Sequence, residues 1–368
     1  MNTYYEKLAK VLVNYSADVQ KGMTVCISGL TVCEPAMMEV YKECLRVGAH
    51  PIMQIAFPHT REHFYDLASD DQLDTMDFVV DHIYRNVDRM IQIWGDVNTK
   101  GFSQFDPQRL ARSQKAYADT IKAMFEREQK GAYKWALTGF PTDARAQDAG
   151  MALHQYEDFI FKAALLDKDD PVAEWKAISA EQKKICEWLT KRSTIRYVGL
   201  DTDITFSTKG RKWINCDGHR NFPDGEVYTC PLEDSANGTI RFTYPMVYMG
   251  NEIEDVMLTF KDGVVTEATA AKGQKLLNEV LEIDAGARRL GELAIGTNYG
   301  ITRFTKNMLY DEKIGGTVHL ALGRSADPEG GKNESSIHLD ILKDMKEGGK
   351  IYADGELIYE DGKFVIEF

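Results

Sequence analysis

The chain has 368 residues, of which 43% are hydrophobic and 27% charged, and its formal net charge is −13. These proportions are typical of a globular protein of about two domains and exclude a collagen-like or intrinsically disordered chain. An acidic protein repels phosphate at long range, so nucleic acid and anionic membrane are poor partners, whereas its carboxylates are available as metal ligands.

The N-terminal segment and the cysteines both indicate an intracellular protein without disulfides. The first 22 residues contain no apolar signal core, and no apolar run approaches the roughly 20 residues that cross a bilayer. We therefore expect a cytoplasmic protein. No CxxC pair occurs, and we expect the cysteines to be buried free thiols. They are Cys26, Cys33, Cys44, Cys186, Cys216 and Cys230.

The first half of the chain alternates between helical and strand-like segments. Helices are predicted at 3–16, 35–46 and 107–129, and strands at 23–28, 51–57, 89–94 and 135–138. Apolar strands alternating with helices predict a parallel sheet that is covered on both faces. No GxGxxG or P-loop sequence is present, so a nucleotide site is not indicated.

The second half has a different pattern. Residues 151–192 are predicted to be helical, and short β-like runs with Gly and Asp turns follow, interrupted by a helix predicted at 272–290. Asp354–Gly355 and Asp361–Gly362 predict two hairpins near the C-terminus. We therefore predict an α/β domain at 1–190 and an α+β domain at 191–368, mainly antiparallel, that carries the functional site.

Three residues of the second half are candidate metal ligands. His319 lies inside an apolar strand-like run, and His338 and Asp340 are two residues apart in another. Residues i and i+2 of a strand point to the same face, and imidazole with carboxylate suits Zn, Mn, Co or Fe. Surface or core positions for these histidines stay open from these residues alone.

Other candidate residues carry weaker signals. Glu226 lies in a loop-like NFPDGEV segment, and Glu292 lies just past the end of a helical pattern, where a solvated carboxylate is the simpler interpretation. His59 and His63 are four residues apart, but without a third ligand they are predicted to be surface residues. His219 is a weak candidate for lining a substrate pocket.

Four segments together resemble the thermophilic-type metallo-aminopeptidases, the M29 family of aminopeptidase T and aminopeptidase S. They occur in the family's order, and the resemblance covers nearly the whole chain. The segments are NFPDGEV, ARRLGELAIGTN, LYDEKIGGTVHLALG and GGKNESSIHLD.

The resemblance implies a centre of two divalent ions, Zn, Co or Mn, that activates a water molecule to hydrolyse the first peptide bond of short peptides. It also implies a homodimer and a second role for Glu226 as general base. The ligands implied by the family motif are Glu226, Glu292, His319, His338 and Asp340.

One position departs from the family pattern. The family has a tyrosine seven residues after the histidine of its GTxHxAxG motif, and this chain has Ala326 there. A hydroxyl at this position would stabilise the oxyanion, and losing one such donor typically costs about 10²–10³ in rate. A substitute donor (Tyr244, Tyr310 or Arg324), a slower or different enzyme, or metal binding without peptidase activity would each account for the alanine.

A second enzyme class is the alternative. His319, His338 and Asp340 alone would form the two-histidine, one-carboxylate site of a non-haem Fe(II) ring-cleaving dioxygenase. Such a site needs open positions, so Glu226 and Glu292 as additional ligands argue against this alternative.

Overall fold

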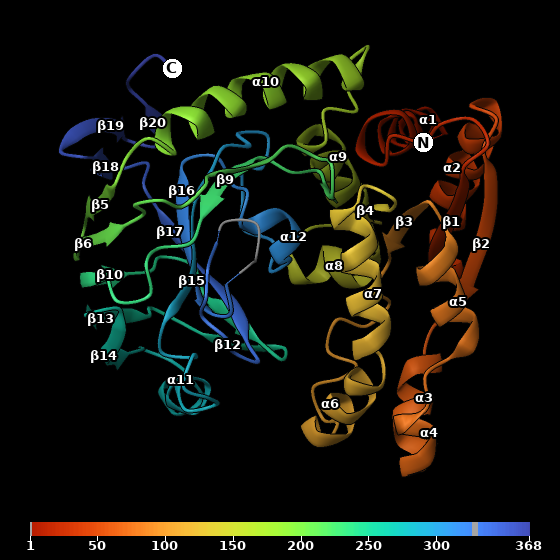
Figure 1. The fold of residues 1–368 in the computed structure, drawn as a ribbon, viewed down its shortest axis with the longest axis horizontal. Coiled ribbons are helices and arrows are strands. Elements are labelled where there is room, and N and C mark those ends of the chain that lie inside the picture. Colours follow the sequence, from red (N-terminus) through yellow and green to blue (C-terminus); the bar gives the residue numbers. More distant parts are fainter. Residues whose placement is uncertain (1, 326–329) are drawn as a thin grey trace. The chain divides into compact units, whose positions relative to one another are not determined.

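The computed structural model describes residues 2–325 and 330–368, and it forms two compact units (Figure 1). Unit 1 comprises Met1–Glu174 and Gly218–Pro223, and unit 2 comprises Trp175–Asp217 and Asp224–Phe368. The change of unit falls inside the long helix α10 (Pro171–Leu189). The boundary near residue 190 stays a prediction for independently folding domains.

Unit 1 contains a parallel five-stranded sheet in the order β2-β1-β3-β4-β8. Cys26 of β1 packs with Ile83 and Met124 of the helices on one face, while its neighbours Val25 and Ile27 are fully buried on the other. The predicted parallel sheet with two covered faces is thus confirmed. The strands are β1 (Thr24–Leu30), β2 (His50–Ala56), β3 (Arg89–Trp94), β4 (Lys134–Gly139) and β8 (Asn221–Phe222).

The helices of unit 1 follow the predicted order with local differences. The N-terminal helix ends as a π-helical turn (Leu12–Ser16), and the predicted helix at 107–129 divides at Tyr117 into two. The α-helices are α1 (Asn2–Val11), α2 (Glu34–Arg46), α3 (Thr60–Leu67), α4 (Asp70–Asp74), α5 (Phe78–Asn86), α6 (Pro107–Ala116), α7 (Ala118–Gln129), α8 (Asp143–Asp148) and α9 (Leu153–Ala163). A short 3₁₀ turn, Thr31–Cys33, precedes α2.

Unit 2 contains two large antiparallel sheets and a two-stranded ribbon. The larger has eight strands in the order β14-β13-β10-β6-β5-β18-β19-β20, and the smaller has five in the order β17-β16-β15-β9-β7. The strands of the larger sheet are β5 (Thr194–Gly199), β6 (Thr202–Ser207), β10 (Asn237–Arg241), β13 (Met257–Lys261), β14 (Val264–Thr269), β18 (Lys350–Ala353), β19 (Glu356–Glu360) and β20 (Lys363–Phe364). Those of the smaller sheet are β7 (Ile214–Cys216), β9 (Glu226–Thr229), β15 (Leu290–Gly296), β16 (Thr317–Gly323) and β17 (His338–Asp344).

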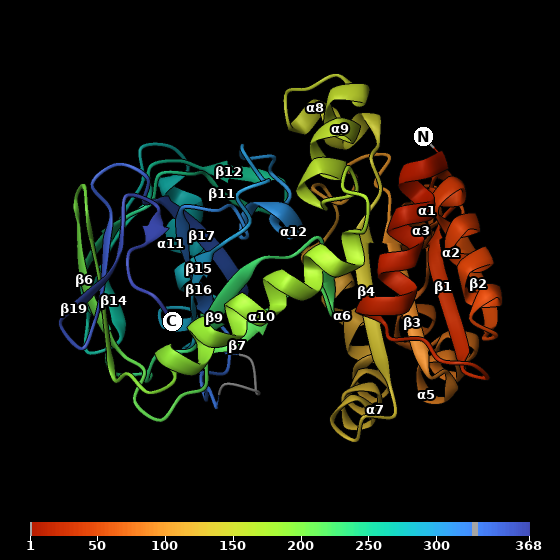
Figure 2. The ribbon, with the colours of Figure 1, turned by 90° about the horizontal axis from the view of Figure 1, so that it is seen from above.

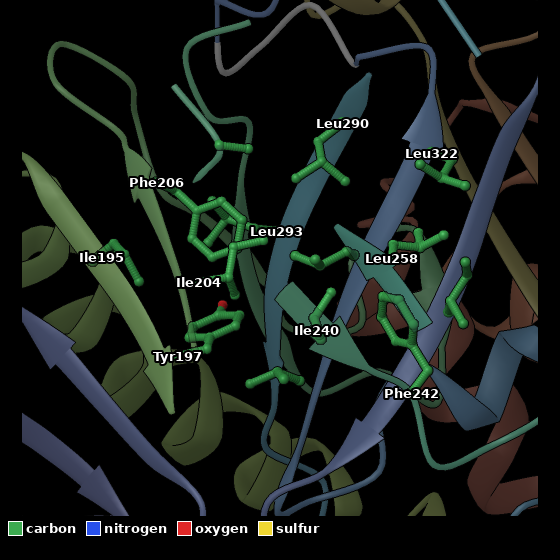
Figure 3. Packing of buried hydrophobic residues seen from close by; sticks show 14 of the residues in the cluster. Ile195, Tyr197, Ile204, Phe206, Ile240, Phe242, Leu258, Leu290, Leu293 and Leu322 are labelled. Carbon is green, nitrogen blue, oxygen red and sulfur yellow. The ribbon is translucent and has the colours of Figure 1, made fainter. Parts of the chain in front are cut away.

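The two sheets of unit 2 share one hydrophobic core. Ile204 and Ile240 of the larger sheet and Leu293 and Leu320 of the smaller sheet are at most 1% exposed and belong to one cluster of buried side chains. Figure 3 shows part of this packing. Because one face of each sheet is buried in this core, the opposite face of the smaller sheet is left for polar residues.

Smaller elements complete unit 2. Figure 2 shows α10 running beside β7 and β9, and Gln182 of α10 donates hydrogen bonds to the carbonyls of Cys216 and Glu226 at 3.0 Å each. The remaining elements are α11 (Gln274–Leu281), α12 (Met308–Asp311) and the ribbon β11 (Met246–Tyr248) with β12 (Asn251–Ile253). No helix within the described ranges is long and apolar enough to cross a membrane.

Two sequence predictions about this unit need correction. The helix predicted at 272–290 ends at Leu281, and the chain turns before β15 begins, so Glu292 lies within a strand. Glu226 is the first residue of β9 and not part of a loop, because it pairs with Gly296 of β15. In both cases long-range strand pairing decides the local structure, and local composition does not report that pairing.

The predicted C-terminal hairpins are confirmed. β18 and β19 pair around Asp354–Gly355, and β19 and β20 pair around Asp361–Gly362. All four turn residues have φ between 46° and 86°, the left-handed region that an Asp-Gly turn adopts in a two-residue hairpin.

Candidate metal centre

The register of the smaller sheet places the predicted histidines and Asp340 on one face. In β16, Val318, Leu320 and Leu322 enter the hydrophobic core, so His319 points to the opposite face. Asp340 of β17 pairs with Ala321, two residues from His319, and therefore shares its face. The small side chain of Ala321 leaves room between the two functional groups.

Glu226 and Glu292 project from the same face of the sheet. Glu292 pairs with Ala321 of β16, and Glu226 pairs with Gly296, four residues after Glu292 in β15. Residues directly opposite in an antiparallel pair lie on one side of the sheet. All five ligands implied by the family motif are therefore brought to one surface by four strands.

The functional atoms lie close together around His319. Its Nε2 is 3.1 Å from Glu292 Oε1, 3.3 Å from Glu226 Oε2 and 4.0 Å from Asp340 Oδ1. Donor atoms from three side chains thus point at a common position.

A second group of donor atoms lies around His338. Its Nε2 is 3.6 Å from Glu292 Oε2 and 3.7 Å from Asp340 Oδ1, while its Nδ1 donates to the carbonyl of Arg324 at 2.7 Å. The bond from Nδ1 leaves Nε2 with a free lone pair, which is how a metal-binding histidine is normally oriented. Two groups result, Glu226–Glu292–His319 and Glu292–His338–Asp340, and Glu292 belongs to both.

Several of these buried atoms have no hydrogen-bond partner within the part of the chain that the structure describes. They are Glu226 Oε2, His319 Nδ1 and Asp340 Oδ1. Buried polar atoms are normally satisfied, so an unpartnered oxygen in each of the two donor groups points to bound cations. The donor set, three carboxylates and two imidazoles, fits divalent transition metals.

The protonation of this cluster without metal follows from burial and mutual charge. Burial opposes a charge on His319, but the hydrogen bond to Glu292 and the nearby carboxylates raise its pKa to about 10. Burial raises the pKa of Glu226 to about 8 and that of Asp340 to about 6. Several carboxylates confined together thus hold protons that a metal ion would displace.

The comparison with known proteins agrees with this chemistry. A sequence profile of the thermophilic metalloprotease (M29) family matches residues 1–364 of the chain.

This chain belongs to the M29 metalloprotease family.

Two aminopeptidases and one solved structure are similar over the full length. Aminopeptidase 2 of Geobacillus stearothermophilus is 26% identical over 98% of both chains, and aminopeptidase AmpS of Bacillus subtilis is 27% identical over 99% of this chain and 98% of its own. The structure of wild-type AmpT from Thermus thermophilus superposes with a TM-score of 0.85 over 99% of both chains at 22% identity. This superposition supports the fold.

Family membership decides between the enzyme classes. An M29 metalloprotease is a metal-dependent hydrolase, which confirms the predicted class. The alternative of a mononuclear iron dioxygenase is not supported, because Glu226 and Glu292 stand at positions that an iron site would keep open.

Lys313, Asp224 and Glu312 lie beside the candidate metal ligands and were not singled out from the sequence. Lys313 is fully buried, and its Nζ lies 3.7 Å from Glu226 Oε1 and 3.9 Å from Asp224 Oδ1 and contacts Glu312. Burial acts against its charge, but these carboxylates hold the pKa of Lys313 well above its usual range. Cys216, Asp224 and Glu226 also form a group of close donor atoms. The sequence signal that could have identified Lys313 is its place in the family segment LYDEKIGG.

The structure places the three suggested oxyanion donors in different surroundings. The hydroxyl of Tyr244 donates to Asp344 Oδ2 at 3.1 Å, Tyr310 is 1% exposed, and the backbone of Arg324 accepts from His338. Ala326 lies outside the described residues.

The other predicted histidines lie in unit 1. His59 and His63 are exposed, as expected for surface residues, and His59 Nδ1 is 3.3 Å from Glu62 Oε1. The ring of His219 packs on Tyr15 with centroids 4.3 Å apart. All six cysteines are free; five are buried and Cys216 is partly buried.

Proposed function

We propose that this metalloprotease is an aminopeptidase that removes the N-terminal residue of short peptides with two divalent ions, Zn, Co or Mn. The observation that carries the proposal is the pair of donor groups that share Glu292. Glu292 Oε1 faces His319 and Oε2 faces His338, as a bridging carboxylate would. The proposed ligands are Glu226, Glu292, His319, His338 and Asp340.

Formal charge also supports two ions. Among the described residues, Asp224, Glu226 and Glu312 lie around the ammonium of Lys313, and Glu292 and Asp340 belong to the neighbouring donor groups. Five carboxylates and one ammonium leave a formal charge of −4, which two divalent cations would neutralise. One ion would leave a buried excess of negative charge, which is costly.

The side chains would divide the chemistry. When bound, the metal centre supplies a Lewis acid and a water molecule of lowered pKa. Glu292 would hold the two metal positions at a fixed separation, and His338 would be oriented by its bond to the Arg324 carbonyl. Glu226 would act as ligand and, through its proton affinity, as the general base that receives a proton from the attacking water.

Substrate size, assembly and location complete the proposal. We infer that the substrates are short peptides with a free N-terminal amine, that the enzyme is a cytoplasmic homodimer, and that residues 191–368 form the catalytic domain. The names of the relatives, aminopeptidase 2 and aminopeptidase AmpS, support the reaction.

The deciding experiment joins metal analysis to a peptide panel. The purified protein, loaded separately with Zn, Co and Mn, is expected to hold two ions per chain and to release N-terminal residues from di- and tripeptides. The same peptides with an acetylated N-terminus are the control and should resist cleavage. Equal cleavage of acetylated peptides, or no release from the whole panel, contradicts the aminopeptidase proposal.

A further inference from the structure

Lys313 is a fully buried lysine beside the proposed metal ligands. We propose that it is a positioning residue that holds Oε1 of Glu226, so that Oε2 is presented to the metal position shared with His319 and Glu292. This inference rests on the proposed dinuclear function. Lys313 has no exposed surface, and Glu226 is the proposed metal ligand that its ammonium pairs with.

The two oxygens of Glu226 face different partners. Oε1 lies 3.7 Å from Lys313 Nζ, and Oε2 lies 3.3 Å from His319 Nε2 without a hydrogen-bond partner in the described part of the chain. A buried carboxylate with one oxygen paired to a cation has one oxygen left for a metal. The arrangement therefore favours coordination of a single ion by Glu226 through Oε2.

The backbone on both sides of this contact is fixed independently of the ammonium group. Asn298 donates its backbone N–H to the Lys313 carbonyl at 3.0 Å and its side-chain amide to the Asp224 carbonyl at 2.8 Å. Gln182 donates to the Glu226 carbonyl at 3.0 Å. Because these hydrogen bonds hold both main chains, the contribution of the Lys313 ammonium is to orient the Glu226 carboxylate.

Charge explains why a cation is needed at this point. Glu226, Asp224 and Glu312 all face the ammonium of Lys313. Without it, these carboxylates would repel one another in a site from which water is largely excluded. Glu226 would then turn away from the cluster or take up a proton, and either change removes a ligand oxygen.

The proposal predicts unequal effects on the two metal positions. Glu226 belongs to the group with Glu292 and His319, but not to the group with His338 and Asp340. Lys313→Met should weaken the first position about 10–100-fold, the usual size of an effect transmitted through a ligand. The second position should keep its affinity.

The test is a chelator-competition titration with Zn or Co, with bound metal measured by mass spectrometry. Wild type should retain two ions at a chelator concentration where Lys313→Met retains one. The matched control is Lys343→Met, because Lys343 is also buried but donates to the carbonyls of Leu200 and Arg241 on the core side of β17. This control should retain two ions.

A double-mutant cycle separates positioning from general damage. If Lys313 acts through Glu226, then adding Lys313→Met to Glu226→Gln should lower metal content no further. The proposal is overturned if Lys313→Met retains two ions with unchanged affinity, or if it loses both ions equally. It is also overturned if the losses of metal in the double-mutant cycle are additive. Should Lys313→Met not fold, Lys313→Gln keeps a polar donor and is judged by the same criteria.

The outcome for wild type keeps the two proposals distinct. A wild type that binds a single ion contradicts the dinuclear function, and the positioning role is then judged on that ion. A loss of affinity in Lys313→Met that disappears in the Glu226→Gln background upholds the role, and an unchanged affinity overturns it.

Discussion

Glu292 has the most demanding position among the proposed ligands. Its two oxygens face two different histidines, 3.1 Å from His319 and 3.6 Å from His338, and no other carboxylate of the described residues belongs to both donor groups. Its side chain has to be held by a rigid strand, because a shared ligand that moves disturbs both metal positions at once.

Substituting single ligands should distinguish Glu292, which belongs to both donor groups, from His338, which belongs to one. Glu292→Ala is expected to lose both ions, whereas His338→Ala should lose one, and each should lower peptidase activity by more than about 100-fold. Metal content and kcat/KM of purified variants test this. Glu282→Ala, which removes a mostly exposed carboxylate, is the control. Full metal content and rate in both ligand variants would show that the assignment is wrong.

The alanine at position 326 gives a separate test of catalysis. If the missing hydroxyl limits turnover, Ala326→Tyr should raise kcat toward the factor of about 10²–10³ that an oxyanion donor supplies. Ala326→Phe, which adds the ring without the hydroxyl, should not. An unchanged or lower rate for the tyrosine variant would favour a substitute donor.

Metal affinity should depend steeply on pH. In the metal-free enzyme the pKa of His319 is raised to about 10, so His319 carries a proton at neutral pH, and the nearby carboxylates also raise the pKa of His338. Metals bind neutral imidazole, so affinity should increase as the pH rises from 6 to 9, by about tenfold per pH unit for each proton released.

Chelator competition at several pH values, with proton release measured in weak buffer, checks this dependence. His59→Ala, at an exposed position outside the cluster, should show the wild-type slope. An affinity that does not change with pH would contradict the proposed displacement of protons.

At the scale of elements, a β-bulge in β15 decides which way Glu292 points. The register between β15 and β16 shifts between Leu290 and Glu292, so Gly291 is the additional residue. Leu290 belongs to the hydrophobic core, and without the bulge Glu292, two residues later, would face that core as well. The bulge turns the carboxylate to the metal-facing side.

Gly291 should therefore be intolerant of any side chain. A Cβ at this position would lie 2.2 Å from the carbonyl oxygen of Arg324, the same oxygen that accepts from His338 Nδ1. Gly291→Ala should lower metal affinity at both positions and reduce the free energy of unfolding by about 1–3 kcal/mol.

Denaturant unfolding and metal titration measure these effects. Gly199→Ala in β5 is the control, because the nearest atom to its Cβ would be Lys343 Cε at 3.3 Å, away from the proposed ligands. Wild-type metal affinity in Gly291→Ala would show that the bulge does not position Glu292.

At the scale of the whole molecule, the proposed metal centre belongs to one unit. All five proposed ligands lie in unit 2, and they come from β9, β15, β16 and β17. Metal that binds only the folded site stabilises that unit by mass action. Unit 1 has its own sheet and core and holds none of the proposed ligands.

Chelation should therefore destabilise the two units unequally. Removing metal is expected to lower the stability of unit 2 by about 2.7 kcal/mol if metal had been present at 100 times its Kd. After chelation, the backbone amides of β15–β17 should exchange hydrogen faster than in the metal-loaded protein, and those of β1–β4 should exchange at an unchanged rate. Adding back Zn or Co is the control and should restore protection. Equal acceleration in both units would argue against a site confined to unit 2.

Residue types and local patterns of the site are determined by the amino-acid sequence itself. The apolar run TVHLAL predicts a strand around His319, the i, i+2 spacing puts His338 beside Asp340, and the Asp-Gly turns predict the C-terminal hairpins. These features depend on neighbours in the chain and on the two-residue period of a strand.

Only the tertiary structure decided how these residues cooperate. The strand positions of Glu226 and Glu292, the bulge at Gly291 and the burial of Lys313 all depend on which distant strands pair and in which register. Such pairings follow from packing over the whole unit rather than from local sequence. Residue types and their spacing therefore indicated metal-binding chemistry, while the sharing of Glu292 between two donor groups required the assembled sheet.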